Sequence, residues 1–166
     1  MDLCVRNVRE SDAEGIVAIL NPIIEAGEYT VLDTPATVEF EREYIAGFPP
    51  RGIFCVAEDQ AEGRLVGFQS LEPYATYTRG FDHIGVLGTY VDLACRSCGV
   101  GTMLARCTFG KARRHGYEKI TTYMRADNLD SLAFHIKLGF RIVGTAYRQV
   151  KIGHTYVDEV TLEKFL

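Results

Sequence analysis

The sequence has no apolar run long enough to cross a membrane. A membrane-spanning helix needs about 18 or more consecutive apolar residues, and no uninterrupted segment approaches that length. The first residues carry charges at Asp2, Arg6 and Arg9, so they lack the apolar core of a signal peptide. We therefore expect a cytoplasmic protein with no membrane partner.

An excess of basic charge is also absent. The chain has 18 Lys and Arg residues against 22 Asp and Glu residues, which gives a formal net charge of −4. A nucleic-acid-binding domain normally carries a basic excess or a basic stripe. The composition therefore predicts no nucleic-acid partner.

Cysteine occurs in an odd number, at Cys4, Cys55, Cys95, Cys98 and Cys107. This set does not match a secreted disulfide framework, so we expect reduced thiols, with Cys4 and Cys55 as small core residues. The Cys95-x-x-Cys98 pair precedes a predicted helix, and a helix N-terminus lowers a thiol pKa, as in a thiol–disulfide oxidoreductase. It has no second ligand pair at zinc spacing, and we expect no metal.

The pattern of apolar residues predicts alternating strands and helices. With 166 residues and 47% hydrophobic content, the chain can bury one core, and we expect a single α/β domain over residues 1–166. The predicted strands are 3–8, 53–57, 65–71, 84–93, 120–124, 140–147 and 156–162. The predicted helices are 11–24, 35–46, 101–115 and 128–138.

Four residues carry local expectations. Ser11 opens a capping-box pattern before the first helix, and Pro22 predicts that this helix bends or restarts. Gly85 and Gly88 interrupt the fourth strand, which suggests a bulge or a close approach of another backbone.

Residues 91–104 form the most informative segment. The pattern predicts a strand end, a loop containing Gly99 and Gly101, and the first turn of a helix. Such a helix start presents unpaired N–H groups and the positive end of the helix dipole, which favours a phosphate-bearing ligand. Glycine pairs before helices also occur as ordinary turns, so this segment alone does not identify the ligand.

Two motifs in sequence order give the chain a resemblance to the GCN5-related N-acetyltransferase (GNAT) superfamily. The first is Arg96-x-x-Gly99-x-Gly101. The second is Asn128-x-x-Ser131-x-x-x-His135-x-x-x-Gly139-Phe140. Residues 18–21, 56–58, 65–67 and 134–140 are similar to the phosphinothricin acetyltransferase-like branch.

The resemblance implies a GNAT fold, with a mixed central sheet of six to seven strands and about four helices, splayed at the acetyl-CoA site. It implies an N-acetyltransferase that takes acetyl-CoA as acyl donor and a primary amine of a small molecule or amino acid as acceptor. The amine would attack the thioester directly in a ternary complex. Members of this branch commonly pair, so the resemblance implies a homodimer.

The resemblance also assigns a donor site. Main-chain amides from Ser97 to Thr102 would hold the pyrophosphate with help from Arg96, and Asn128 would bind the pantetheine arm or the loop leading to it. The full set implied for acetyl-CoA is Tyr90, Val91, Asp92, Leu93, Arg96, Ser97, Cys98, Gly99, Val100, Gly101, Thr102, Asn128 and Ser131.

The resemblance also guides the choice of a catalytic proton donor and a base. His135 occupies the position of the family's proton donor to the departing thiolate, where this branch commonly has histidine. The branch's glutamate before the pyrophosphate loop corresponds here to Val86, which argues against phosphinothricin itself as the substrate. The remaining candidate bases are Asp82, His83, Glu72 and Glu28.

Two irregular segments, 25–36 and 72–82, are expected to overhang the acceptor side. Their candidate substrate-binding residues are Glu28, Tyr29, Glu72, Tyr74 and Tyr77. The tyrosines could form an aromatic wall, although exposed loop positions or dimer contacts would explain them as well.

Three alternatives remain open at this point. The chain could be an acetyl-CoA sensor or scaffold without transferase activity, or a Cys-x-x-Cys oxidoreductase, and a reactive Cys98 could modulate CoA binding.

A basic group stands at the end of the third predicted helix and could contact a nucleotide phosphate. Its members are Lys111, Arg113, Arg114 and His115. Such charges also suit the negative end of the helix dipole.

Overall fold

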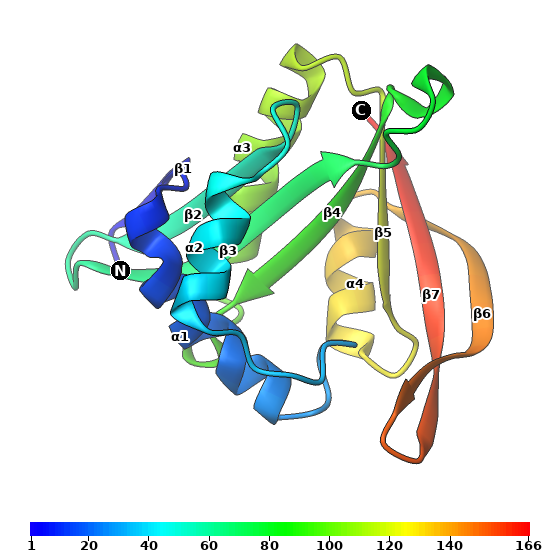
Figure 1. Ribbon diagram of the computed structural model, residues 1–166, viewed down its shortest axis with the longest axis horizontal. Coiled ribbons are helices and arrows are strands. Elements are labelled where there is room, and N and C mark those ends of the chain that lie inside the picture. The colour runs from blue at the N-terminus through cyan, green and yellow to red at the C-terminus, as the bar shows by residue number, and fades with distance from the viewer.

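The computed structural model describes residues 1–166 and contains one seven-stranded sheet with helices on both faces (Figure 1). The strands are β1 (Leu3–Asn7), β2 (Ile53–Asp59), β3 (Arg64–Pro73), β4 (Ile84–Val91), β5 (Lys119–Arg125), β6 (Arg141–Ile152) and β7 (Thr155–Phe165). The α-helices are α1 (Ala13–Glu25), α2 (Val38–Ala46), α3 (Val100–Arg114) and α4 (Leu129–Lys137). Short 3₁₀ turns are η1 (Glu10–Asp12), η2 (Arg79–Phe81) and η3 (Leu93–Cys95).

The strand order is β1-β2-β3-β4-β5-β7-β6, and every neighbouring pair is antiparallel except β4 and β5. The predicted α/β class and mixed sheet are therefore confirmed. No helix combines the length and the apolar character needed to cross a bilayer.

The parallel pair β4–β5 is short. Its register runs only from Ile84 opposite Lys119 to Val86 opposite Thr121. Beyond this point the Thr122 hydroxyl donates to the Leu87 carbonyl at 2.9 Å, and the two strands then diverge (Figure 1). The rest of β4 thus has a sheet partner on the β3 side only, and a gap opens toward β5.

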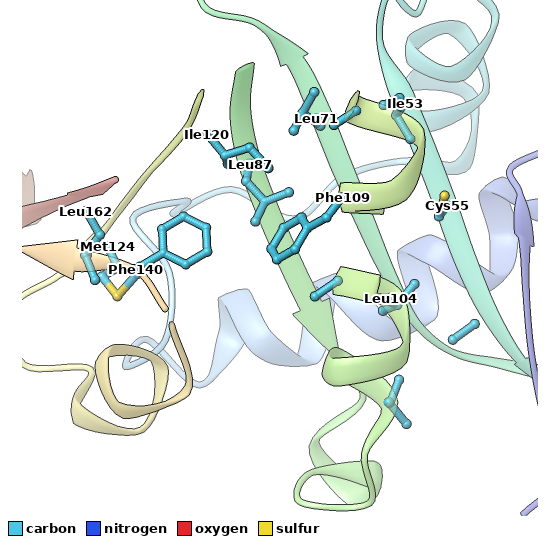
Figure 2. Packing of buried hydrophobic residues seen from close by; sticks show 14 of the residues in the cluster. Ile53, Cys55, Leu71, Leu87, Leu104, Phe109, Ile120, Met124, Phe140 and Leu162 are labelled. Atoms are coloured by element: carbon cyan, nitrogen blue, oxygen red, sulfur yellow. The ribbon is translucent and has the colours of Figure 1, made fainter. Parts of the chain in front are cut away.

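Two apolar clusters hold the helices against opposite faces of the sheet. Helices α1 and α2 pack on one face, over a cluster that includes Phe54 and Phe68. Helix α3 packs on the other face, where Leu104 is fully buried. In Figure 2 the rings of Phe109 from α3 and Phe140 lie toward each other, with centroids 6.0 Å apart. This contact joins α3 to the segment between α4 and β6.

The start of α1 differs from the prediction. Ser11 is exposed and does not cap the helix, whereas the Asp12 carboxylate accepts from the Arg9 N–H at 2.7 Å and from Arg6 at 2.7 and 2.9 Å. A carboxylate held by an arginine satisfies this turn better than a solvent-exposed hydroxyl. The predicted restart at Pro22 is also wrong, because α1 continues to Glu25. Pro22 lies near the end of the helix, where its missing N–H costs a single hydrogen bond.

The two glycines in β4 produce no bulge against β3, since the register from Gly85 to Val91 is continuous. Gly85 instead allows a close approach, because a Cβ there would lie 2.6 Å from Leu71 Cδ2. The irregular positions are in β2, between Ala57 and Glu58, and in β6.

We expect Leu104→Ala to lower the free energy of unfolding by about 2–5 kcal/mol, because it leaves a cavity beneath α3. The neighbouring variant Met103→Ala, at a position on the solvent side of the same helix, should change it by about 0.5 kcal/mol or less. Urea unfolding measures both. Equal losses in the two variants would show that α3 is not held by this cluster.

Candidate functional site

A cavity of about 530 Å³ lies where β4 and β5 diverge. Five segments line it, namely the end of α1, the loop that follows, the end of β4, the loop before α3 and helix α4. The lining residues are Ile23, Tyr29, Thr89, Tyr90, Val91, Cys95, Arg96, Ser97, Gly99, Val100, Gly101, Thr102, Asn128, Asp130, Ser131, Ala133, Phe134, His135 and Lys137. The two sequence motifs therefore meet in one cavity, although a helix and a strand separate them in the chain.

The loop before α3 presents a row of free donors. The N–H groups of residues 97–102 donate no hydrogen bond within the chain, and the first regular helical bond runs from Met103 N to Gly99 O at 3.0 Å. Ser97 and Gly99 both have left-handed backbone conformations, with φ of 61° and 84°. Such conformations turn successive N–H groups toward one side and form an anion-binding concavity at the helix N-terminus.

The two motif glycines have different roles. Gly99 is needed for its positive φ, and a Cβ added there would meet nothing within 4 Å, so the space beside it is open. A Cβ on Gly101 would lie 2.9 Å from Phe134 Cζ. Gly101 thus lets α4 pack against the first turn of α3, a role that the phosphate interpretation did not include.

The loop after α1 links both motifs. The Arg96 guanidinium lies over the Tyr29 ring, 3.8 Å from its centroid. The Tyr29 carbonyl accepts from Asn128 Nδ2 at 2.9 Å, while Asn128 Oδ1 accepts from Ser131 N at 3.1 Å and caps α4. Since both ends of the Asn128 amide are engaged, this residue positions the loop and α4.

The end of β4 offers backbone groups to the gap. Ile84 O accepts from Tyr74 N and Asp92 N donates to Val66 O, so even-numbered residues of this strand face β3. Strand backbone groups alternate in direction, so the N–H and C=O of Thr89 and Val91 face the side where β5 has diverged. An extended ligand could pair with them as a strand would.

His135 is a buried titratable group that lines the cavity, with 4% of its surface exposed. Its Nδ1 lies 2.8 Å from the Ser131 carbonyl, and its Nε2 has no hydrogen-bond partner. Burial lowers the pKa of His135, and the bond to Ser131 only partly opposes this effect. The neutral ring therefore carries its proton on Nδ1 and leaves Nε2 as an acceptor, which becomes a donor only after it takes up a proton.

Asp92, Leu93 and Cys98 do not line the cavity, unlike the rest of the predicted donor set. Asp92 caps η3 by accepting from Ala94 N at 2.9 Å, and it forms an ion pair with Arg64 at 2.7 Å. Cys98 is exposed while Cys95 is buried. Asp92 therefore braces the loop that precedes the row of free amides.

Two of the candidate bases, Asp82 and His83, lie at the wrong end of β4. They precede its first residue, whereas the cavity is at its last residues. Asp82 also lies 3.6 Å from both Arg51 and Arg79. Glu28 is exposed and lines a second cavity of about 390 Å³ beside Asn128.

The predicted tyrosines do not form a single wall. Tyr29 lines the main cavity, while Tyr74 and Tyr77 pack on Phe81 with centroid distances of 5.2 and 6.1 Å and line neither cavity. Tyr77 is 83% exposed. Glu72 accepts from the Tyr44 hydroxyl, on the α2 side of the sheet.

At the end of α3, Lys111 donates to Asn7 and to Cys55 Sγ, at 2.5 and 3.2 Å, so it contacts β1 and β2. Arg113, Arg114 and His115 are exposed at the end of α3 opposite to the cavity.

Sequence reasoning missed several lining residues, notably Ile23, Thr89 and Phe134. Thr89 could have been found, since it directly precedes the predicted Tyr90. Phe134 could have been found from its place beside His135. Ile23 had no local signal, because its part in the cavity depends on how α1 packs.

Comparisons with known proteins find acetyltransferases. The protein-family model described as "Acetyltransferase (GNAT) family" matches residues 21–140 of the chain. The L-methionine sulfoximine/L-methionine sulfone acetyltransferase of Pseudomonas paraeruginosa is 25% identical over 146 residues, which cover 87% of this chain and 83% of the relative. The glucosamine 6-phosphate N-acetyltransferase of Trypanosoma brucei brucei is 30% identical over 142 residues, with coverages of 85% and 90%.

Solved structures share the fold. The phosphinothricin acetyltransferase of Sinorhizobium meliloti, solved in complex with AcCoA, matches with a TM-score of 0.89 over 100% of this chain and 89% of that chain, at 18% identity.

We expect Gly99→Asp to weaken acetyl-CoA binding by about tenfold or more, because it places a carboxylate beside the free amides at the helix N-terminus. Gly99→Asn is the matched control, since asparagine has the same shape, no charge and some tolerance of positive φ. Isothermal titration calorimetry at low salt compares the two. Equal affinities would remove this loop from the donor site.

His135 should make stability depend on pH. Below about pH 6.5 the unfolded chain takes up a proton at this imidazole, while the buried ring in the folded chain resists protonation. The free energy of unfolding should therefore fall as the pH drops from about 7.5 to about 5.5, and fall less in His135→Phe. Urea unfolding at these pH values measures the difference.

The control for this measurement is His154→Phe, at an exposed turn, which should keep the decline of the parent protein. An unchanged decline in His135→Phe would contradict the buried, neutral state of this ring.

Proposed function

The chain belongs to the acetyltransferase (GNAT) family and is an acetyl-CoA-dependent acetyltransferase, and we propose that its acceptor is a primary amine of a small molecule or amino acid. The observation that carries the proposal is the row of free amides 97–102, which ends in a cavity opened by the divergence of β4 and β5. The cavity of about 530 Å³ is lined mainly by the residues assigned to the donor, so its volume supports a small-molecule donor site, and the acceptor class rests on the relatives.

The donor would be held by backbone groups of two segments. The amides of residues 97–102 would bind the pyrophosphate, and Arg96 would add positive charge from its place over Tyr29. The backbone groups of Val91 and Thr89 would pair with the amides of the pantetheine arm. This division of roles uses main-chain atoms, so it tolerates substitution at most of the side chains involved.

Thr89 would also assist the reaction. Its N–H faces the gap and would donate to the thioester oxygen as negative charge develops there. His135 Nε2, which has no hydrogen-bond partner within the chain, would take up a proton from the reacting nitrogen and pass it to the departing sulfur.

The acceptor class is supported by the relatives, whose names specify methionine sulfoximine, methionine sulfone and glucosamine 6-phosphate. These are small molecules with a primary amine, but their chemistry otherwise differs. Val86 continues to argue against phosphinothricin itself. The homodimer and the cytoplasmic location stay predictions.

No observation favours the alternatives. An oxidoreductase would need Cys95 and Cys98 in one accessible pair, whereas Cys95 is buried and Cys98 is exposed outside the cavity. A sensor would bind acetyl-CoA with the same backbone groups, so turnover distinguishes the two functions.

A panel assay tests the proposal. Acetyl-CoA is incubated with the protein and with amino acids, amino sugars, polyamines and peptides, and free CoA thiol is measured. We expect turnover with one class of small primary amine and none with its N,N-dimethyl analogue. Binding of acetyl-CoA without turnover on any amine would contradict the proposal and favour the sensor.

A further inference from the structure

We propose that Glu72 is the general base that deprotonates the acceptor amine, in place of the carboxylate that Val86 does not supply. This inference rests on the proposed function. Glu72 lies in β3. The phosphinothricin acetyltransferase-like branch carries its glutamate at the position of Val86, in the neighbouring strand β4.

The sheet register brings position 72 beside position 86. Glu72 and Val86 are direct partners in the antiparallel β3–β4 pair. Partners of this kind point to the same face, with Cβ atoms about 4.5–5.5 Å apart. A glutamate at position 72 therefore reaches much of the volume that a glutamate at position 86 would reach.

The face is the one that α2 covers. Phe68 and Tyr90, the partners four residues further along the ladder, stack at 4.9 Å within the cluster under α1 and α2. Side chains two and four residues away along a strand share this face, so Ser70 and Glu72 follow Phe68. The contact between Glu72 and Tyr44 of α2 agrees with this direction.

Glu72 also lies beside the point where the gap begins. Val86 is the last residue of β4 that pairs with β5, through Thr121. The free amides and His135 approach the gap from the side of α3 and α4. Glu72 lines neither cavity, so the proposal requires the amine to enter from the opposite face, past Glu72, and to meet the thioester carbon there.

The carboxylate of Glu72 accepts one hydrogen bond and forms no ion pair. The Tyr44 hydroxyl donates to Oε1 at 2.5 Å, and Oε2 has no hydrogen bond within the chain. Burial, together with Glu72, raises the pKa of Tyr44, so this hydroxyl stays protonated and keeps donating. Glu72 forms no ion pair, unlike Asp82, which lies near Arg51 and Arg79. One oxygen is oriented, and the other is free to accept a proton.

The side chain that contacts Glu72 from α2 is Tyr44, which lies near Glu41 of the same helix, and burial raises the pKa of Glu41. Because Glu72 forms no ion pair, its charge favours a cationic amine over an anionic acceptor.

The proton balance is complete. Glu72 takes one proton from the ammonium, directly or through a water, and leaves the nitrogen lone pair free. A carbon–nitrogen bond then forms as the carbon–sulfur bond breaks. The second nitrogen proton passes to the departing sulfur, and Glu72 later releases its proton to solvent. The products are the N-acetyl amine, CoA thiol and one proton.

The test uses Glu72→Gln and the double variant Glu72→Gln/Val86→Glu. We expect Glu72→Gln to lower kcat by about 100-fold or more near neutral pH, with unchanged acetyl-CoA affinity by calorimetry. Its rate should rise toward high pH, where the amine is already neutral. The double variant should recover at least about a tenth of the lost rate, because it returns a carboxylate to the neighbouring position.

Asp82→Asn is the matched control, and it should keep the kcat and pH profile of the parent protein. If Glu72→Gln does not fold, Glu72→Asp is measured in the same assay. We then expect a lower kcat and a pH profile that keeps its acidic limb. If Glu72→Gln keeps the kcat of the parent protein, on an amine that the parent acetylates, Glu72 is not the base. The proposed function would still stand in that case. Absence of turnover by the parent on every amine would overturn the proposed function and this inference with it.

Discussion

The structure depends on the early end of one strand pair. A parallel ladder normally satisfies the backbone of both strands along their length, but β4 and β5 stop pairing after Val86 and Thr121. The unpaired backbone that results is stable only because other elements line the opening. Helix α4, the loop after α1 and the loop before α3 all meet there. Most features of the donor site follow from this single interruption.

Local sequence signals predicted the parts of the structure that local chemistry determines. The free amides at the start of α3 depend on residues 97–102 alone, so the first motif located them. Hydrophobic periodicity likewise located the strands and helices. These elements bury apolar faces whose spacing is written in the chain itself.

Relations between distant segments could not be predicted in this way. Arg96 lies over Tyr29, and Gly101 touches Phe134, through packing that no local pattern encodes. The Ser11 cap failed because Arg6, on the preceding strand, holds Asp12 instead. The four candidate bases could not be ranked from sequence, since their distances from the gap depend on sheet register.

The pairing of positions 72 and 86 has a consequence for how such enzymes diverge. Two residues on one rung of a sheet are neighbours in space although a turn and an irregular segment separate them in the chain. A carboxylate carried by either strand would therefore serve the same side of the gap. A comparison of sequences position by position would count Val86 as a lost carboxylate. A comparison of paired strand positions would find a carboxylate at Glu72, beside it.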